Sequence, residues 1–324
     1  MNTTIKNTLI VFGIPTAYAV ILRLFFGIEK WNELFEVMSV TFLFCLPTIV
    51  GALTVFLSDR EKVEKLSYRI MAPWIPISLF LIITLAFAIE GWACWLMILP
   101  VFLIAASIGG LIGGYLKLKK QDNRLNISLM VLIPFLFAPL ESLINKLPST
   151  YEAYTYIDIK GEPEKIWDNV TRVEAIKEDE DSGWLNKFLG FPRPVKAELD
   201  FEGVGAYREA VFTNGLVFHE TVTEYQDNKL MVFDIKAYPH EIPSTTLDEH
   251  VVIGGNYFNV LNGKYELEDL GNGLHRLHLS SKFEMKTTFN FYAGWWGKWI
   301  MKDIQNNILK VEKKRVETNS LWKK

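Results

Sequence analysis

The chain has 324 residues, half of them hydrophobic, and a formal net charge of −3. Residues 151–324 hold 28 acidic and 22 basic residues without a basic stripe, which argues against a nucleic-acid partner. Cys45 and Cys94 both lie in apolar runs, so neither a disulfide framework nor a cysteine-based metal site is expected. Because almost all long apolar runs fall within residues 1–150, we expect an all-α transmembrane domain over residues 1–147 and a separate domain over residues 148–324.

Five apolar segments predict a transmembrane bundle of about five helices. A helix that crosses a bilayer needs about 20 apolar residues. The second and fourth segments meet this length comfortably, whereas the third and fifth are shorter and the fifth contains Pro134 and Pro139. The segments are Leu9–Ile28, Val37–Leu57, Trp74–Ile89, Trp92–Leu116 and Ile127–Leu143.

The charged loops predict how this bundle is oriented. Basic residues gather in Ser58–Arg69 and Lys117–Asn126, which the positive-inside rule places in the cytoplasm. The C-terminal domain is then extracytoplasmic if all five segments span, and cytoplasmic if the fifth does not. The paired glycines of residues 109–114 indicate close helix packing. Glu90 and Glu141 are interpreted as headgroup-level residues at helix ends.

The second half predicts a mixed domain whose strands precede a long C-terminal helix. Alternating apolar residues indicate strands, and a change to helical spacing after residue 289 indicates the final helix. In chain order we expect strand Tyr151–Lys160, helices Pro163–Ile176 and Gly183–Gly190, strands Val195–Glu202, Gly205–Thr213, Leu216–Gln226, Lys229–Ala237, Tyr257–Leu270 and Leu274–Lys286, and helix Phe289–Val316.

One hairpin of this half carries the main candidates for chemistry, Arg208 and Glu220. Asn214-Gly215 is typical of a two-residue turn, so residues whose numbers sum to 429 should face each other. Arg208 would then oppose Thr221 and point away from Glu220, unless a bulge intervenes. Glu220 shares a strand face with Phe218, and a carboxyl among apolar neighbours has a raised pKa unless it is paired.

The same hairpin resembles a known family. The stretches G-V-G-A-Y-R-E-A-V-F-T-N-G, F-H-E-T-V-T-E-Y and L-M-V-F-D-I are similar to the START-like SRPBCC superfamily (polyketide cyclase/dehydrase and lipid transport). The closest likeness is to bacterial members fused behind transmembrane helices, and it covers about Tyr151 to Glu317. The resemblance implies an α+β helix-grip fold, in which a curved antiparallel sheet wraps the C-terminal helix around a cavity for an apolar ligand. It implies no shared catalytic set.

We expect the ligand site between this sheet and the final helix, with Glu220 as the candidate catalytic group. No metal is expected, because His275 and His278 lie three apart on a strand and face opposite sides. No cofactor is expected, because the sequence has neither a Walker loop nor a dinucleotide fingerprint. His250 is a loop residue. The candidate ligand-binding residues are Phe218, Glu220, Val222, Phe233, Leu277, Leu279, Phe283, Trp296 and Ile300.

The aromatic cluster that opens the final helix is interpreted as core packing, with a ligand channel or the bilayer surface as alternatives. Its members are Phe289, Phe291, Tyr292, Trp295, Trp296 and Trp299.

Three functions follow from this reading. The favoured one is a binding module, anchored in a bacterial cytoplasmic membrane, whose partners are that membrane and a lipid or other hydrophobic small molecule. The alternatives are a cyclase/dehydrase-like or hydrolytic enzyme that uses Glu220 as acid-base, and a membrane sensor that relays ligand occupancy to the helices. The sequence leaves the ligand, protein partners and oligomeric state open.

Overall fold

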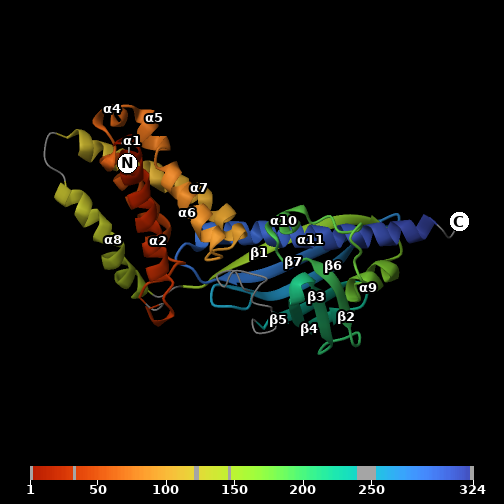
Figure 1. The fold of residues 1–324 in the computed structure, drawn as a ribbon. Coiled ribbons are helices and arrows are strands. Elements are labelled where there is room, and N and C mark those ends of the chain that lie inside the picture. The colour runs from red at the N-terminus through yellow and green to blue at the C-terminus, as the bar shows by residue number, and fades with distance from the viewer. Residues whose placement is uncertain (1–2, 32–33, 120–123, 145–146, 239–252, 322–324) are drawn as a thin grey trace. The chain divides into compact units, whose positions relative to one another are not determined.

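The computed structural model describes residues 3–31, 34–119, 124–144, 147–238 and 253–321. They divide into two compact units, Met1–Lys146 and Leu147–Lys324, which are described separately. Figure 1 shows that the first unit is helical and that the second combines a sheet with helices. His240, His250 and the expected loop Pro239–Pro243 lie outside the described residues.

The first unit consists of apolar helices joined by short connections. Two of them begin with a π-helical turn, Leu9–Gly13 before α2 and Thr41–Cys45 before α3. The helices are α1 (Thr3–Thr8), α2 (Ile14–Phe26), α3 (Leu46–Leu57), α4 (Arg60–Val63), α5 (Leu66–Met71), α6 (Trp74–Ala86), α7 (Trp92–Leu118) and α8 (Arg124–Ser142).

Among the described residues of this unit, three continuous helices are long and apolar enough to cross a membrane: Ile5–Phe26, Leu66–Ala86 and Trp92–Leu118. The expected lengths of the second and third segments were wrong. The second is helical over only Thr41–Leu57 in its apolar part, because the chain bends at residues 37–39. The third gains α5 at its start, since the backbone hydrogen bond from Ile75 N to Ala72 O joins α5 to α6 across Pro73.

Glycines bring α3 and α7 into direct backbone contact. A Cβ added at Gly109 would overlap the carbonyl of Thr48, and one added at Gly51 would overlap that of Ala106. Small residues that permit such an approach are typical of helix interfaces in membranes. The expected packing role of the glycine pairs is therefore confirmed.

The acidic residues of the first unit have protein partners. Glu90 forms an ion pair with Arg23, and both side chains are buried. The two carboxylate oxygens of Glu141 accept hydrogen bonds from the backbone N–H groups of Val40 (2.7 Å) and Thr41 (2.8 Å). These N–H groups lie at the start of a helix. Both carboxylates thus hold the bundle together, a role that headgroup placement alone did not predict.

The second unit is built on one antiparallel sheet of seven strands in the order β1-β7-β6-β5-β4-β3-β2. Register shifts at Val222/Glu224 in β4 and Val260/Asn262 in β6 mark bulges, which increase the twist and bend of a sheet. The strands are β1 (Ser149–Lys160), β2 (Pro194–Leu199), β3 (Tyr207–Phe212), β4 (Val217–Gln226), β5 (Leu230–Lys236), β6 (Phe258–Gly271) and β7 (Leu274–Met285).

In the described part of this unit, three helices accompany the sheet: α9 (Pro163–Thr171), α10 (Trp184–Leu189) and α11 (Asn290–Leu321). The long α11 packs on β1 and β7 and contacts α9 and α10 (Figure 1). Helix α9 ends five residues earlier than expected because the following chain joins the sheet, where Val173 bridges Ala197. The element order confirms the START-like helix-grip fold that the resemblance implied.

Candidate functional site

The site centres on the β3–β4 hairpin, whose register differs from the expected one. Arg208 lies opposite Glu220, so paired residues sum to 428 rather than 429. Three residues, Thr213–Gly215, form the connection, and Asn214 and Gly215 both adopt positive φ angles (63° and 77°). This extra turn residue shifts the pairing by one, which moves the two charged side chains onto the same face.

Arg208 and Glu220 form a buried ion pair that also holds α9. Nη1 of Arg208 donates to Oε2 of Glu220 at 2.5 Å, and each residue is only 3% exposed. Nε of Arg208 donates to the carbonyl of Thr171 at 3.1 Å, and Nη2 donates to that of Val170 at 3.2 Å. A cation at the last carbonyls of a helix is favoured by their orientation. The pair thus fixes the end of α9 on the sheet.

Aromatic rings from β5 and β6 lie against the guanidinium of Arg208. Its Cζ lies 5.6 Å from the ring centre of Phe233 in β5 and 5.9 Å from that of Tyr265 in β6. Burial raises the pKa of the Glu220 carboxyl, and the charge of Arg208 opposes that rise. Burial also raises the pKa of Tyr265. Because these groups are buried, solvent screens their charges only weakly, and they interact as one electrostatic cluster.

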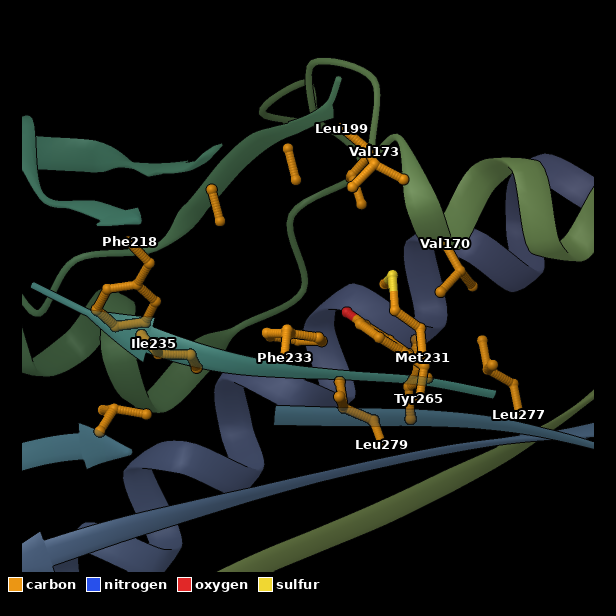
Figure 2. Close-up of a cluster of buried hydrophobic side chains, with 14 of the residues drawn as sticks. Val170, Val173, Leu199, Phe218, Met231, Phe233, Ile235, Tyr265, Leu277 and Leu279 are labelled. Atoms are coloured by element: carbon orange, nitrogen blue, oxygen red, sulfur yellow. The ribbon is translucent and has the colours of Figure 1, made fainter. Parts of the chain in front are cut away.

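A cavity lies beside this cluster, between the sheet and α11. Its volume is about 60 Å³, which is the space that the centre of a water-sized sphere can occupy. Apolar side chains make up most of its wall, and Figure 2 shows Phe218, Ile235, Phe233 and Leu279 along the strands that form it. Helix α11 contributes Met301, Ile304, Gln305 and Ile308, and the polar wall includes Arg208, Glu220 and Ser281.

Gln305, a polar residue that α11 contributes to the cavity wall, forms hydrogen bonds through both its amide nitrogen and its amide oxygen. Nε2 of Gln305 donates to the carbonyl of Ala153 (3.0 Å) and to Oγ of Ser281 (3.1 Å), and its Oε1 accepts from Oγ1 of Thr155 (3.1 Å). The side chain is 2% exposed. These bonds tie α11 to β1 and β7, so Gln305 positions the helix over the cavity.

Farther along α11, Glu312 is buried without a hydrogen bond to either carboxyl oxygen among the described residues. Its exposure is 0%. Burial raises the pKa of Glu312 to about 8, with smaller opposing effects from Arg315 and Arg208. The carboxyl is therefore mostly protonated at neutral pH, because the fold stabilises its uncharged form.

The structure brings together some of the expected ligand-binding residues. Phe218, Glu220, Phe233 and Leu279 line the cavity. The others lie elsewhere in the second unit: Val222 pairs with Phe233 across β4 and β5, Leu277 is buried in the core, Phe283 stacks on Tyr151, and Trp296 and Ile300 belong to α11 outside the described cavity wall.

The cavity wall also contains residues that sequence reasoning had not assigned to the ligand. Met301, Ile304 and Ile308 are spaced i, i+3 and i+7, a spacing that indicates one buried face of α11 but not what that face covers. Tyr265 carried no signal of its own, because its role depends on Arg208, and two strands, β4 and β5, lie between them in the sheet.

The histidines of the described part of the chain do not assemble a metal site. No group of three or more potential ligands is present there. His275 is buried, whereas Nδ1 of His278 bonds the hydroxyl of Tyr154 at 2.7 Å on the other face of the sheet. The two side chains of β7 diverge as strand geometry requires.

Several solved structures are similar to about half of this chain at low sequence identity. No protein-family model matches the chain, and none of the curated proteins matches it. Among solved structures it is similar to a START superfamily protein from Mycobacterium smegmatis (11% identity, 52% of this chain and 98% of that one, TM-score 0.35). It is also similar to a norcoclaurine synthase mutant from Thalictrum flavum in complex with a transition-state analogue (13%, 54% and 98%, 0.34). A third is the Aha1 dimer from Colwellia psychrerythraea (19%, 52% and 96%, 0.28).

Proposed function

We propose that the second unit binds a lipid or other hydrophobic small molecule in the cavity between the sheet and α11. The observation that carries this proposal is the composition of the cavity wall. Phenylalanine, isoleucine, leucine and methionine side chains from β3–β7 and α11 surround it, and a small number of polar groups lie at fixed positions. Ligand sites are commonly apolar with a few convergent polar groups that orient the ligand.

The size and polarity of the cavity limit which ligands it can hold. A water molecule needs about 10–15 Å³ of such volume, so the present space corresponds to roughly four to six waters. A short alkyl chain or a single ring fits this space, and a longer lipid requires α11 to move away from the sheet. The polar end of the ligand would lie near Arg208 and Glu220, the charged pair in the wall.

The enzymatic alternative has weaker support. An acid-base catalyst must exchange a proton with its substrate. Glu220 does line the cavity, but one of its oxygens accepts the short bond from Arg208, and the guanidinium in turn holds two carbonyls of α9. This arrangement gives the pair a structural role that is complete without a substrate. Binding is therefore the function that the geometry favours.

We further propose that the first unit anchors the chain in a membrane. Its support is the presence of three helices of sufficient length and hydropathy, together with the contact of α3 and α7 through glycine. The basic loops predicted to be cytoplasmic contain Arg60, Lys62 and Lys117. An anchored chain should remain in the membrane fraction after alkaline extraction, and its release would contradict the anchor.

Photolabelling of the full chain in lipid nanodiscs tests the binding proposal. The probe is a photoreactive medium-chain alcohol, which is apolar apart from one hydroxyl. We expect mass spectrometry to locate the label on the β3 peptide and on the α11 peptide that contains Met301 and Ile304. Ala210→Phe places a ring in the cavity and should abolish this labelling, because Ala210 lines the wall.

The matched control is Ala175→Phe, which adds the same ring at an exposed position. It should label as the unmodified protein does. Labelling of both peptides that survives Ala210→Phe would contradict the cavity as the binding site. Labelling confined to the apolar helices of the first unit would contradict a ligand site in the second unit altogether.

A further inference from the structure

Helix α11 carries an exposed aromatic stripe that the cavity does not explain. Phe291, Trp295 and Trp299 are 72%, 54% and 44% exposed, although each ring is large and apolar. They are spaced by four residues, so they follow one side of the helix. The rings of Trp295 and Trp299 are 5.2 Å apart, which makes the surface continuous.

The stripe is confined to the first part of α11. The same side of the helix continues with Lys302, Asn306, Lys310 and Lys314, all exposed and all polar. The chemical character of this side therefore changes from aromatic to polar after Trp299. A change of this kind is typical of a surface that leaves an apolar environment and enters water.

The aromatic end of α11 is the end tied to the start of the second unit. Nδ2 of Asn290 donates to the carbonyl of Leu147 at 3.1 Å and to Oγ of Ser149 at 3.0 Å. Leu147 follows the end of the apolar helix α8, Ser142, by five residues.

Short helix α10 carries two further exposed rings. Trp184 and Phe188 are 64% and 54% exposed. Asn186, which lies between them, donates from Nδ2 to the carbonyl of Ile300 at 3.1 Å and to Asp303 at 2.9 Å. These bonds place α10 against the part of α11 that follows Trp299.

The charges around these rings identify the surface they fit. Lys298 and Lys302 on α11 and Lys187 on α10 are exposed among the aromatic residues. The exposed positions of α11 from residue 291 to residue 314 include no acidic residue. Tryptophan favours the headgroup level of a bilayer, and lysine near such a surface is attracted to anionic lipids.

We propose that the first three turns of α11, together with α10, lie on the surface of an anionic lipid bilayer. The rings enter the headgroup region and the lysines contact lipid phosphates. The polar continuation of α11 after Asn306 stays in water. This contact fixes how the second unit is held at the membrane, and it is independent of what the cavity binds.

Spin-label accessibility in vesicles tests this proposal with the full chain. Cys45→Ala and Cys94→Ala remove the native thiols, and single cysteines replace Phe291, Trp295 or Trp299 in turn. The vesicles contain phosphatidylcholine and phosphatidylglycerol. Oxygen concentrates in bilayers and a nickel chelate stays in water, so we expect the ratio of their collision rates to be several-fold higher at these positions than at matched labels.

The matched labels are cysteines at Lys310 and Lys314, on the same side of α11. Equal ratios at both sets of positions would overturn the proposal. Dipolar broadening between labels at position 295 would also overturn it, because a second copy of the chain would then cover the stripe. A variant with Lys298→Glu and Lys302→Glu should lower the ratio of the two collision rates at position 295. An unchanged ratio would contradict the proposed contact between these lysines and lipid phosphates.

Discussion

Replacing Glu220 with glutamine should loosen the β3–β4 hairpin and the end of α9 together. The change keeps the shape of the side chain and removes its charge. Arg208 then remains as a cation that is 3% exposed, bonded to two neutral carbonyls and an amide. Removing one partner of a buried ion pair costs about 3–5 kcal/mol. We expect the lower end of this range, because the amide oxygen of glutamine still accepts a hydrogen bond.

Hydrogen exchange measured by mass spectrometry isolates this effect from the rest of the chain. A loss of about 3 kcal/mol corresponds to roughly 150-fold faster exchange, since about 1.4 kcal/mol is a factor of ten. Faster hydrogen exchange is expected in peptides of β3, β4 and α9 whose backbone amides exchange when this region opens. Peptides of α7 should not change, because that helix belongs to the other unit.

Two variants decide whether the ion pair is the cause. Glu224→Gln lies on the same strand at an exposed position and should leave exchange unchanged. The double variant Arg208→Met with Glu220→Leu should recover much of the loss, since it removes both buried charges. The recovery should be incomplete, because the carbonyls of Val170 and Thr171 lose their donor. Exchange within about threefold of the unmodified protein in Glu220→Gln would refute the argument, because it corresponds to under 1 kcal/mol.

Two further predictions concern other parts of the chain. Between the ordinary glutamate pKa of 4.5 and the folded value of about 8, the folded Glu312 holds a proton that the unfolded chain releases, so stability should fall by about 1.4 kcal/mol per pH unit as pH rises. Glu312→Gln should remove this slope in unfolding curves recorded from pH 5.5 to 8.5, and a slope that persists would exclude Glu312 as its source. Gly109→Val should lower the temperature at which the detergent-solubilised chain aggregates, because its side chain would meet the Thr48 carbonyl, and overpacking costs about 1–3 kcal/mol. Gly13→Ala meets no atom within 4 Å and serves as the control; equal losses in both variants would contradict the contact.

The fold of the second unit could be predicted from the sequence because the signals for its strands, turns and final helix are local. Strand alternation, glycine and asparagine turns, and the helical spacing after residue 289 each act within a few residues. Strand ends and the end of α9 were less accessible. They depend on pairing between distant segments, as when Val173 leaves the helix to bridge Ala197.

The candidate site shows where local reasoning fails. Asn214-Gly215 correctly located the hairpin, but Thr213 also belongs to its connection, and that single residue reverses the predicted relation of Arg208 and Glu220. Turn length is set by backbone geometry that composition does not specify. The pairing of Glu90 with Arg23 was hidden for another reason, since the partners are 67 residues apart in the chain.

The pairing of β1 with β7 has a consequence for how the chain is made. Ser149 is hydrogen-bonded in register with Met285, which the ribosome adds 136 residues later. At a synthesis rate of about 5–20 residues per second, the ribosome adds Met285 roughly 7 to 27 s after Ser149. Throughout that interval the backbone groups of β1 offer an open edge to other strands. Nascent chains that stall between these two strands should therefore depend on a chaperone to stay free of aggregates.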